Sequence, residues 1–187
     1  TKYLLIMTYN NLPLYYIGID DEELGMSAIS LVDDPAVERN FLKFKKDYKF
    51  RQDYDQHIIF GPAIIPDKPI YRKDGDKEYY VCFGRDVIES MVIKYSKQNL
   101  WNSVNLQHND IPEDNIIMIS FLIKNSDLGI VPRYYEDLPD GTLFVAFKVM
   151  NEEVWERVKD GELQGFSIEC LAELVEMPDD DLDDYLR

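Results

Sequence analysis

The residue best suited to take part in a chemical reaction is a serine in the stretch Gly161–Glu169, whose sequence is GELQGFSIE. This pattern predicts the end of a helix, a turn with glycine, and a strand that carries Ser167. A serine hydroxyl becomes a competent nucleophile only when an imidazole within hydrogen-bond reach takes its proton. The chain has two histidines, His57 and His108, so a base for neutral pH comes from a short set of candidates. Together these residues could support acyl transfer.

The same residue types also have ordinary structural uses. A serine or a histidine on a strand, taken alone, is most often structural, and we interpret His57, beside the apolar Ile58, in that way. Gly165 is most simply a turn glycine; the functional alternative is that it lets backbone amides approach a developing oxyanion. Cys170 is a poor alternative nucleophile because no basic residue lies nearby in the sequence to lower the pKa of its thiol.

Composition narrows the class of protein. A chain of 187 residues with 45% hydrophobic and 13% aromatic residues can bury a sizeable core, most simply as one domain. Its net charge of −16 provides no basic field for nucleic acid and favours basic protein partners instead. Two cysteines form neither a disulfide framework nor a metal cluster, which indicates a reducing compartment. We expect no metal, no cofactor, no nucleic acid and no membrane partner, since apolar runs such as Ile116–Ile123 are too short to span a bilayer.

Two helices are predicted around the candidate residues. The first covers Arg85–Asn99, and its apolar residues recur at helical spacing. The second follows Asn151, whose side chain can cap it, and ends at Lys159–Gly161. Glutamates in its first turn suit the positive end of the helix dipole. Because this second helix ends just before the serine-bearing strand, it should fix where that strand begins.

Strands make up much of the remaining pattern. In Val104–His108, alternation places Val104, Leu106 and His108 on one face. Asn115–Lys124 is a nearly continuous apolar run, which predicts a strand buried on both faces, and Phe166–Glu176 reads as a strand or as a strand passing into a short helix. We therefore expect an α+β domain over residues 1–176, built on a mainly antiparallel barrel or rolled sheet, followed by an acidic tail over 177–187.

Four segments carry a resemblance to a known protein family, and their order along the chain matches their order in that family. They are Gly25–Phe44 (GMSAISLVDDPAVERNFLKF), Phe60–Tyr71 (FGPAIIPDKPIY), Asn105–His108 (NLQH) and Leu143–Glu169 (LFVAFKVMNEEVWERVKDGELQGFSIE). In these segments the chain resembles the phage prohead, or head-maturation, serine proteases of the XkdF-like type. That family is similar in turn to the herpesvirus assemblin proteases. The likeness implies a closed β-barrel wrapped by two to four helices, with nucleophile and base on barrel strands.

The resemblance also assigns roles. Ser167 matches the serine nucleophile of the family, and His108 matches its histidine base. Assemblin uses a second histidine downstream of the serine, but this chain has none after His108, so the imidazole would be oriented by a carboxylate, by His57 from upstream, or by no third residue. Glu169 is our first choice, because it lies two residues from Ser167 and would share its strand face. The alternatives are Asp110, Glu173, Glu176 and His57.

What the resemblance implies is a serine endopeptidase that processes prohead proteins during capsid maturation. Its substrates would be scaffold, extensions of the major capsid protein, and the protease itself, inside the prohead that assembles in the host cytoplasm. A homodimer is expected by analogy with assemblin. Two other classes stay open: a catalytically inactive, protease-fold structural or scaffolding component of the phage head, and a binding module that uses its acidic surface.

Overall fold

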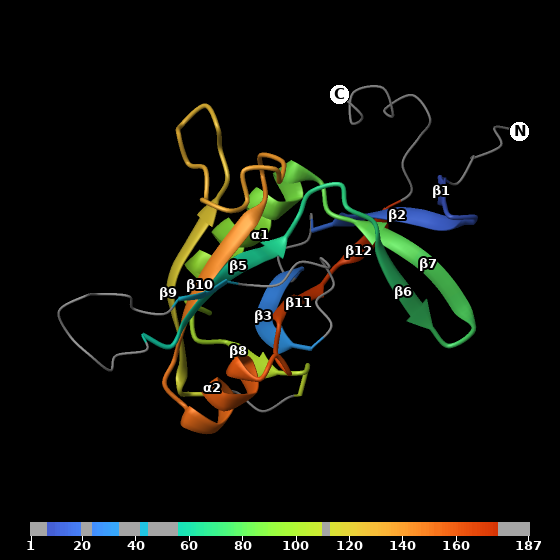
Figure 1. Cartoon of the computed structure of the whole chain (residues 1–187). Helices are drawn as coiled ribbons and strands as arrows, with labels where there is room; N and C mark the ends of the chain where they lie inside the picture. The colour runs from blue at the N-terminus through green and yellow to red at the C-terminus, as the bar shows by residue number, and fades with distance from the viewer. Residues whose placement is uncertain (1–6, 20–23, 34–41, 45–55, 110–112, 176–187) are drawn as a thin grey trace, which may run out of the picture.

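The computed structural model describes residues 7–19, 24–33, 42–44, 56–109 and 113–175 (Figure 1). The predicted acidic tail, 177–187, lies outside these ranges, as do two alternative orienting residues, Asp110 and Glu176. In the described part of the chain, no helix is both long and apolar enough to cross a membrane.

Strands dominate the described chain, with one helix before and one helix after its middle. In chain order the elements are β1 (Thr8–Tyr9), β2 (Leu12–Gly18), β3 (Gly25–Val32), β4 (Leu42–Phe44), β5 (Ile58–Ile64), β6 (Ile70–Asp74), β7 (Lys77–Cys82), α1 (Arg85–Lys97), β8 (Val104–Leu106), β9 (Ile116–Ile123), β10 (Leu143–Val149), α2 (Glu152–Lys159), β11 (Gly165–Leu171) and β12 (Glu173–Val175). They form three sheets. Strands β1, β2, β7 and β6 make one, with β12 added to β2; β4, β5, β10 and β9 make the second; β11, β3 and β8 make the third.

The predicted closed β-barrel is wrong. Within the described residues the strands form three separate sheets, none of which closes on itself, and only two helices accompany them (Figure 1). Periodicity in a sequence predicts that a segment is a strand, but closure depends on which distant strands pair. Here β9 and β4 end one sheet, while β8 and β11 end another, so the ladder never returns to its first strand. The fold is mostly β with little helix.

The three-stranded sheet has two chemically different faces. Phe166 of β11 pairs with Leu31 of β3, which in turn pairs with Leu106 of β8, and all three side chains are buried. This face belongs to the main hydrophobic core, where the ring of Phe166 lies 5.5 Å from that of Phe147 on β10. Because side chains alternate along a strand, the residues between these positions point to the other face.

Helix α2 leads the chain into β11. The side chain of Asn151 accepts hydrogen bonds from the backbone N–H groups of Glu153 (3.0 Å) and Val154 (3.2 Å), so the predicted cap is confirmed. Trp155 is 1% exposed, and its ring stacks on that of His57 with centroids 4.5 Å apart. Gly161, at a φ of 79°, then turns the chain toward β11, a conformation that glycine adopts without steric cost.

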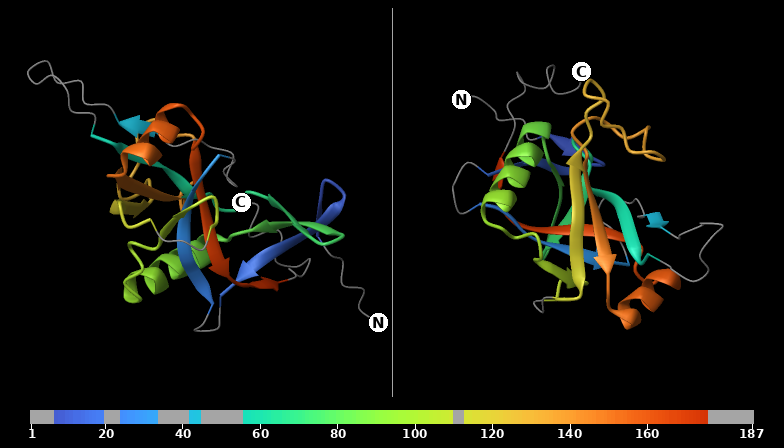
Figure 2. Two further views of the ribbon diagram at one scale, coloured as in Figure 1. Left: turned by 90° about the horizontal axis from the view of Figure 1, so that it is seen from below. Right: turned by 90° about the vertical axis from the view of Figure 1, so that its left-hand side faces the viewer.

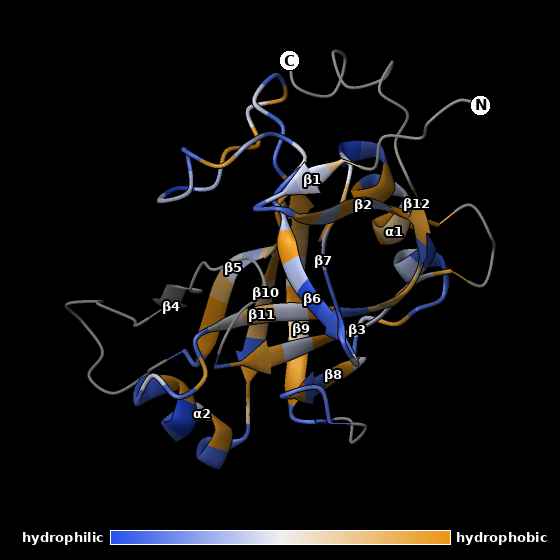
Figure 3. Ribbon diagram, turned by 90° about the vertical axis from the view of Figure 1, so that its right-hand side faces the viewer, coloured by the Kyte–Doolittle hydropathy of each residue, from blue (hydrophilic) through white to orange (hydrophobic). Residues whose placement is uncertain are grey.

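Helix α1 is confirmed, although it ends at Lys97 and not at Asn99, whereas β9 is less buried than predicted. The buried residues of α1 are Ile88, Met91, Val92 and Tyr95, which recur at the predicted helical spacing. In β9, by contrast, Ile119 is 50% exposed and Phe121 is 40% exposed. Among the described strands, β9 ends its sheet beside β10, so no further strand shields the side chains along its outer edge (Figure 2). Its apolar composition is plain in Figure 3.

The cap of α2 gives a direct stability test. Replacing Asn151 with Ala removes the acceptor for two backbone N–H groups and should lower the free energy of unfolding by about 1 kcal/mol. Urea denaturation of both proteins measures the difference. Asn151→Ser is the matched control, because serine also caps helices, and it should retain most of the stability. Equal losses in both variants would contradict the capping role.

Candidate active site

The polar face of the three-stranded sheet gathers four side chains from three strands. Ser30 of β3 pairs across the ladder with Ser167 of β11 and, on its other side, with Asn105 of β8. Glu169 lies two residues after Ser167 and therefore projects from the same face. Ser30, Asn105 and Ser167 are the buried polar residues of this face, at 0%, 6% and 5% exposure.

His108 reaches this face from a turn and not from a strand. The prediction that Val104, Leu106 and His108 share one strand face is wrong, because β8 ends at Leu106. Gln107 and His108 both have a left-handed backbone, with φ of 53° and 56°, and Asn109 N–H donates to Leu106 C=O at 3.0 Å. This turn reverses the chain and brings the imidazole over the face that carries Asn105, opposite to the core-facing Val104 and Leu106.

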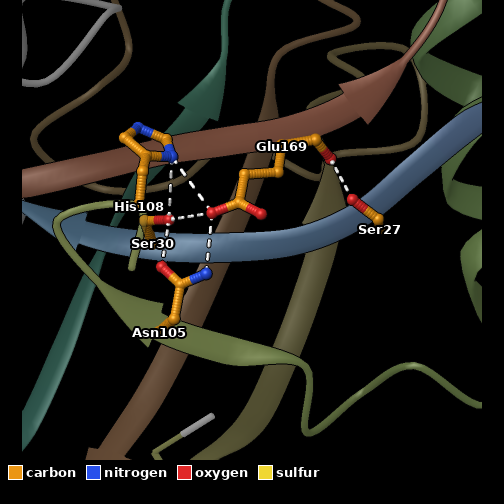
Figure 4. A network of polar contacts seen from close by, with 5 residues as sticks. All are labelled: Ser27, Ser30, Asn105, His108 and Glu169. Carbon is orange, nitrogen blue, oxygen red and sulfur yellow. Dashed lines mark hydrogen bonds and ion pairs between the residues drawn. The ribbon is translucent and has the colours of Figure 1, made fainter. Parts of the chain in front are cut away.

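Glu169 and His108 are in direct contact. The Nδ1 atom of His108 lies 3.1 Å from Oε1 of Glu169 (Figure 4). Asn105 Nδ2 donates to the same carboxylate oxygen at 2.7 Å. The other ring nitrogen of His108, Nε2, points away from the cluster, and the second carboxylate oxygen points away from Ser30 and His108 (Figure 4). The imidazole is therefore held through Nδ1, with Nε2 directed elsewhere.

Ser30 lies at the centre of the cluster and was not among the residues predicted from the sequence. Its Oγ is 2.5 Å from Asn105 Oδ1 and 3.1 Å from both His108 Nδ1 and Glu169 Oε1. One signal could have found it: a serine between Ile29 and Leu31 interrupts an apolar strand, and a polar residue at such a position needs a buried partner. The sequence alone does not say where that partner comes from.

The cluster favours the ionised form of Glu169. Burial raises the pKa of its carboxyl, but the polar contacts with Asn105, His108 and Ser30, in that order of size, outweigh burial and hold the pKa below its ordinary value. The carboxyl is 32% exposed and the imidazole 44% exposed, so the pair lies at the border between the sheet and solvent. A carboxylate placed there can orient the imidazole.

Ser167 is near this pair but does not touch it through a hydrogen bond. Within the described residues, no hydrogen bond joins its hydroxyl to His108. Gly165, the other predicted residue of this strand, begins β11, is buried and pairs with Val32. The structure thus brings His108 and Glu169 into contact and places Ser167 on the same face, two residues from Glu169.

The remaining candidates for the orienting role lie elsewhere. Glu173 is on β12, which pairs with β2 in a different sheet. His57 packs on Trp155 beside α2, and its Nδ1 lies 3.9 Å from a carboxylate oxygen of Glu152. Of the alternatives within the described ranges, none contacts His108. In the same ranges no group of three or more His, Cys, Asp or Glu side chains is placed to hold a metal ion.

A cleft of about 450 Å³ adjoins the cluster on the side of Glu169 and Asn105. Its walls come from the start of β3, the segment after α1, and β8. Its lining residues are Ser27, Ala28, Asn99, Asn102, Ser103, Val104, Asn105 and Glu169. Ser27 also donates from Oγ to the backbone C=O of Glu169 at 3.2 Å, which ties the cleft wall to the strand of the candidate site (Figure 4).

Comparison with models of known protein families identifies the family to which this chain belongs. Residues 47–176, well over half of the chain, match a family model described as "Putative phage serine protease XkdF". The chain belongs to this phage serine protease family. The matched region contains His108, Ser167 and Glu169, whereas Ser30 precedes it. No curated protein and no solved structure matches the chain. Membership of the phage protease family is consistent with a site built from serine, histidine and a carboxylate.

The depressed pKa of Glu169 predicts how stability depends on pH. A carboxylate whose folded pKa lies below its unfolded pKa stabilises the fold above the unfolded value, near 4.5, and this contribution is lost as the pH falls through the folded pKa. Glu169→Gln should therefore lower the free energy of unfolding by about 1 kcal/mol at pH 7. The difference from the wild-type chain should shrink as the pH falls below 4.5. Urea denaturation at several pH values tests this, and a difference that does not change with pH would contradict it.

Proposed function

We propose that this chain is a serine endopeptidase in which Ser167 is the nucleophile, His108 the general base and Glu169 the orienting carboxylate. The observation that carries the proposal is the contact between His108 Nδ1 and Glu169 Oε1 on the sheet face that also bears Ser167. A carboxylate on Nδ1 favours the tautomer with a free lone pair on Nε2, which is the atom that must accept the serine proton. Membership of the phage serine protease family supports the same reaction.

The chemistry follows the acyl-transfer sequence. Ser167 Oγ adds to the carbonyl carbon of a peptide bond while its proton passes to His108 Nε2, and the carbonyl oxygen becomes an oxyanion. The C–N bond then breaks, and the leaving amine takes the proton from Nε2. Water attacks the acyl-enzyme, His108 again accepts and returns the proton, and Ser167 is regenerated. Catalytic hydrogen bonds are often long or poorly aligned before substrate binds, so a Ser167–His108 bond would form in the substrate complex.

Gly165 remains our candidate for the approach of backbone amides to the oxyanion. It lies two residues before Ser167 at the start of β11, and a glycine has no side chain that would obstruct the approach of a carbonyl oxygen to the backbone. The cleft beside Glu169 would hold part of the substrate chain. We propose that the substrates are phage scaffold protein, major capsid protein extensions and the protease itself, that cleavage takes place inside the prohead, and that the active form is a homodimer.

The nucleophile is tested first. Ser167→Ala should abolish cleavage of scaffold and capsid proteins when it is co-expressed with them, and should abolish labelling by a fluorophosphonate probe. His108→Ala should slow labelling by about a thousandfold or more, since the hydroxyl then has no base. Ser120→Ala, which removes an exposed hydroxyl on β9, is the matched control; it should cleave the same proteins and be labelled like the wild-type chain.

Three results would overturn the assignment. Persistent cleavage at the wild-type rate by Ser167→Ala would exclude Ser167, and so would mass-spectrometric mapping of the probe to another residue. Absence of cleavage by the wild-type chain inside assembled proheads would favour the second candidate function, an inactive structural component of the phage head. The specific observation behind that second function is the 5% exposure of Ser167 and its lack of a hydrogen bond to His108 within the described residues.

The cleft is tested separately. Asn102 is an exposed turn residue at its wall, so Asn102→Trp should fill the cleft with little effect on the fold. We expect a drop of about tenfold in kcat/KM for protein substrates, with a smaller change in labelling by a compact fluorophosphonate, because only the protein substrate needs the cleft. Asp76→Trp in the exposed turn between β6 and β7 is the control. Equal activity of both variants would show that substrate does not enter the cleft.

A further inference from the structure

We propose that Ser30 and Asn105 form a positioning pair that sets the tautomer and orientation of the His108 imidazole, Asn105 through its hydrogen bond to Glu169 and Ser30 through its own contact with Nδ1. This inference rests on the proposed function for its catalytic meaning. Neither residue belongs to the three-residue site assigned above, and Ser30 lies outside the region that matches the protease family. The two side chains come from adjacent, directly paired strands, β3 and β8, and both contact Glu169.

The proton positions follow from the donors and acceptors that are available. Asn105 Nδ2 can only donate, and it donates to Glu169 Oε1, so its amide oxygen faces Ser30. Ser30 has a single proton and two neighbouring acceptors, Asn105 Oδ1 at 2.5 Å and Glu169 Oε1 at 3.1 Å. The shorter distance assigns that proton to Asn105. The Ser30 oxygen is then free to accept from His108 Nδ1–H, which is shared with Glu169.

This arrangement selects one histidine tautomer. Both Ser30 Oγ and Glu169 Oε1 face Nδ1 as acceptors, so a proton on Nδ1 is satisfied twice, whereas a bare Nδ1 would face two oxygen lone pairs. The neutral imidazole therefore has its proton on Nδ1 and its lone pair on Nε2. Asn105 fixes the same carboxylate oxygen from the side of β8, which keeps Glu169 in the position where Nδ1 meets it.

Ser30 is placed to orient the His108 imidazole and not to attack a substrate carbonyl as a nucleophile. Its side chain is fully buried, at 0% exposure, and it sits on the ring nitrogen that already faces the carboxylate. A nucleophile must reach an external carbonyl and must lie on the nitrogen opposite the orienting acid. Ser30 meets neither condition. Asn105, at 6% exposure, is likewise a neutral group, and its side-chain hydrogen bonds are to Ser30 and Glu169.

The tautomer can be measured without any activity. Because the chain has two histidines, a ¹⁵N-histidine-labelled sample gives two sets of ring signals, and the set that disappears in His108→Gln belongs to His108. We expect neutral His108 to have its proton on Nδ1 in the wild-type chain. In Ser30→Ala the share of this form should fall. The matched control is Thr142→Val, which removes another fully buried hydroxyl, bonded to Pro139 C=O at 2.7 Å, far from His108 in the fold.

Nucleophile activation gives the second measurement. Ser30→Ala should slow fluorophosphonate labelling of Ser167 by about tenfold, which is the lower end of what removing a group that orients a functional histidine costs. Thr142→Val should label at the wild-type rate even where it loses similar stability. Wild-type tautomer and labelling in Ser30→Ala would overturn the inference.

Asn105→Asp keeps the shape of the side chain and therefore tests the pair even where Ser30→Ala folds poorly. A protonated new carboxyl can donate to Glu169 as the amide does, but two ionised carboxylates in contact repel each other. Since His108 is the titratable group that contacts Glu169, the substitution adds one further ionisable group to the site. The ratio of variant to wild-type labelling rates should therefore fall as the pH rises from about 5 to about 9.

The outcomes separate the two proposals. A ratio for Asn105→Asp that does not change with pH, together with an unchanged His108 tautomer, would show that Ser30 and Asn105 are structural only. A shifted tautomer in a chain whose Ser167 is never labelled would support the positioning pair while overturning the proposed nucleophile. A shifted tautomer with slowed labelling of Ser167 would support both.

Discussion

One carboxylate oxygen organises the candidate site. Oε1 of Glu169 receives hydrogen bonds from Asn105 and from the imidazole of His108, while Ser30 lies against the same atom. The three side chains come from β8, from the turn after it and from the neighbouring strand β3. A charged acceptor that is shared in this way holds its donors more strongly than neutral pairs would, because ionic hydrogen bonds are shorter and stronger. Losing any one element of the three-stranded sheet would release the others.

The two faces of the three-stranded sheet explain why these polar side chains meet. Ile29, Leu31 and Phe166 anchor one face in the core, and the alternation of side chains then forces Ser30, Ser167 and Glu169 to the other face. A slip of one residue in register would exchange the faces, burying the carboxylate in the core and exposing Phe166. The apolar packing therefore specifies the polar site, although no residue of the core takes part in its chemistry.

The sequence predicted local features well and distant pairing poorly. Helix α1, the cap at Asn151 and the shared face of Ser167 and Glu169 depend on neighbours within a few residues, so periodicity was sufficient. The barrel was wrong because closure depends on strands far apart in the chain. His108 was assigned to a strand because alternation cannot reveal a turn with two left-handed residues, neither of them glycine. Ser30 escaped notice for the same reason as the sheet order: its partners are 75 to 139 positions away.

Burying the polar side chains of this cluster costs free energy, and that cost bears on the role of the cluster. Buried polar groups add little net stability when they are satisfied and cost much when they are not, and apolar replacements of similar shape are often neutral or stabilising. The sheet already has one fully apolar face, so the fold does not need a serine, an asparagine and a carboxylate on the other. The left-handed backbone at Gln107 and His108 adds strain that the fold must offset. These two costs support our proposal that His108 acts as a base, with Nε2 directed away from the carboxylate that holds the ring.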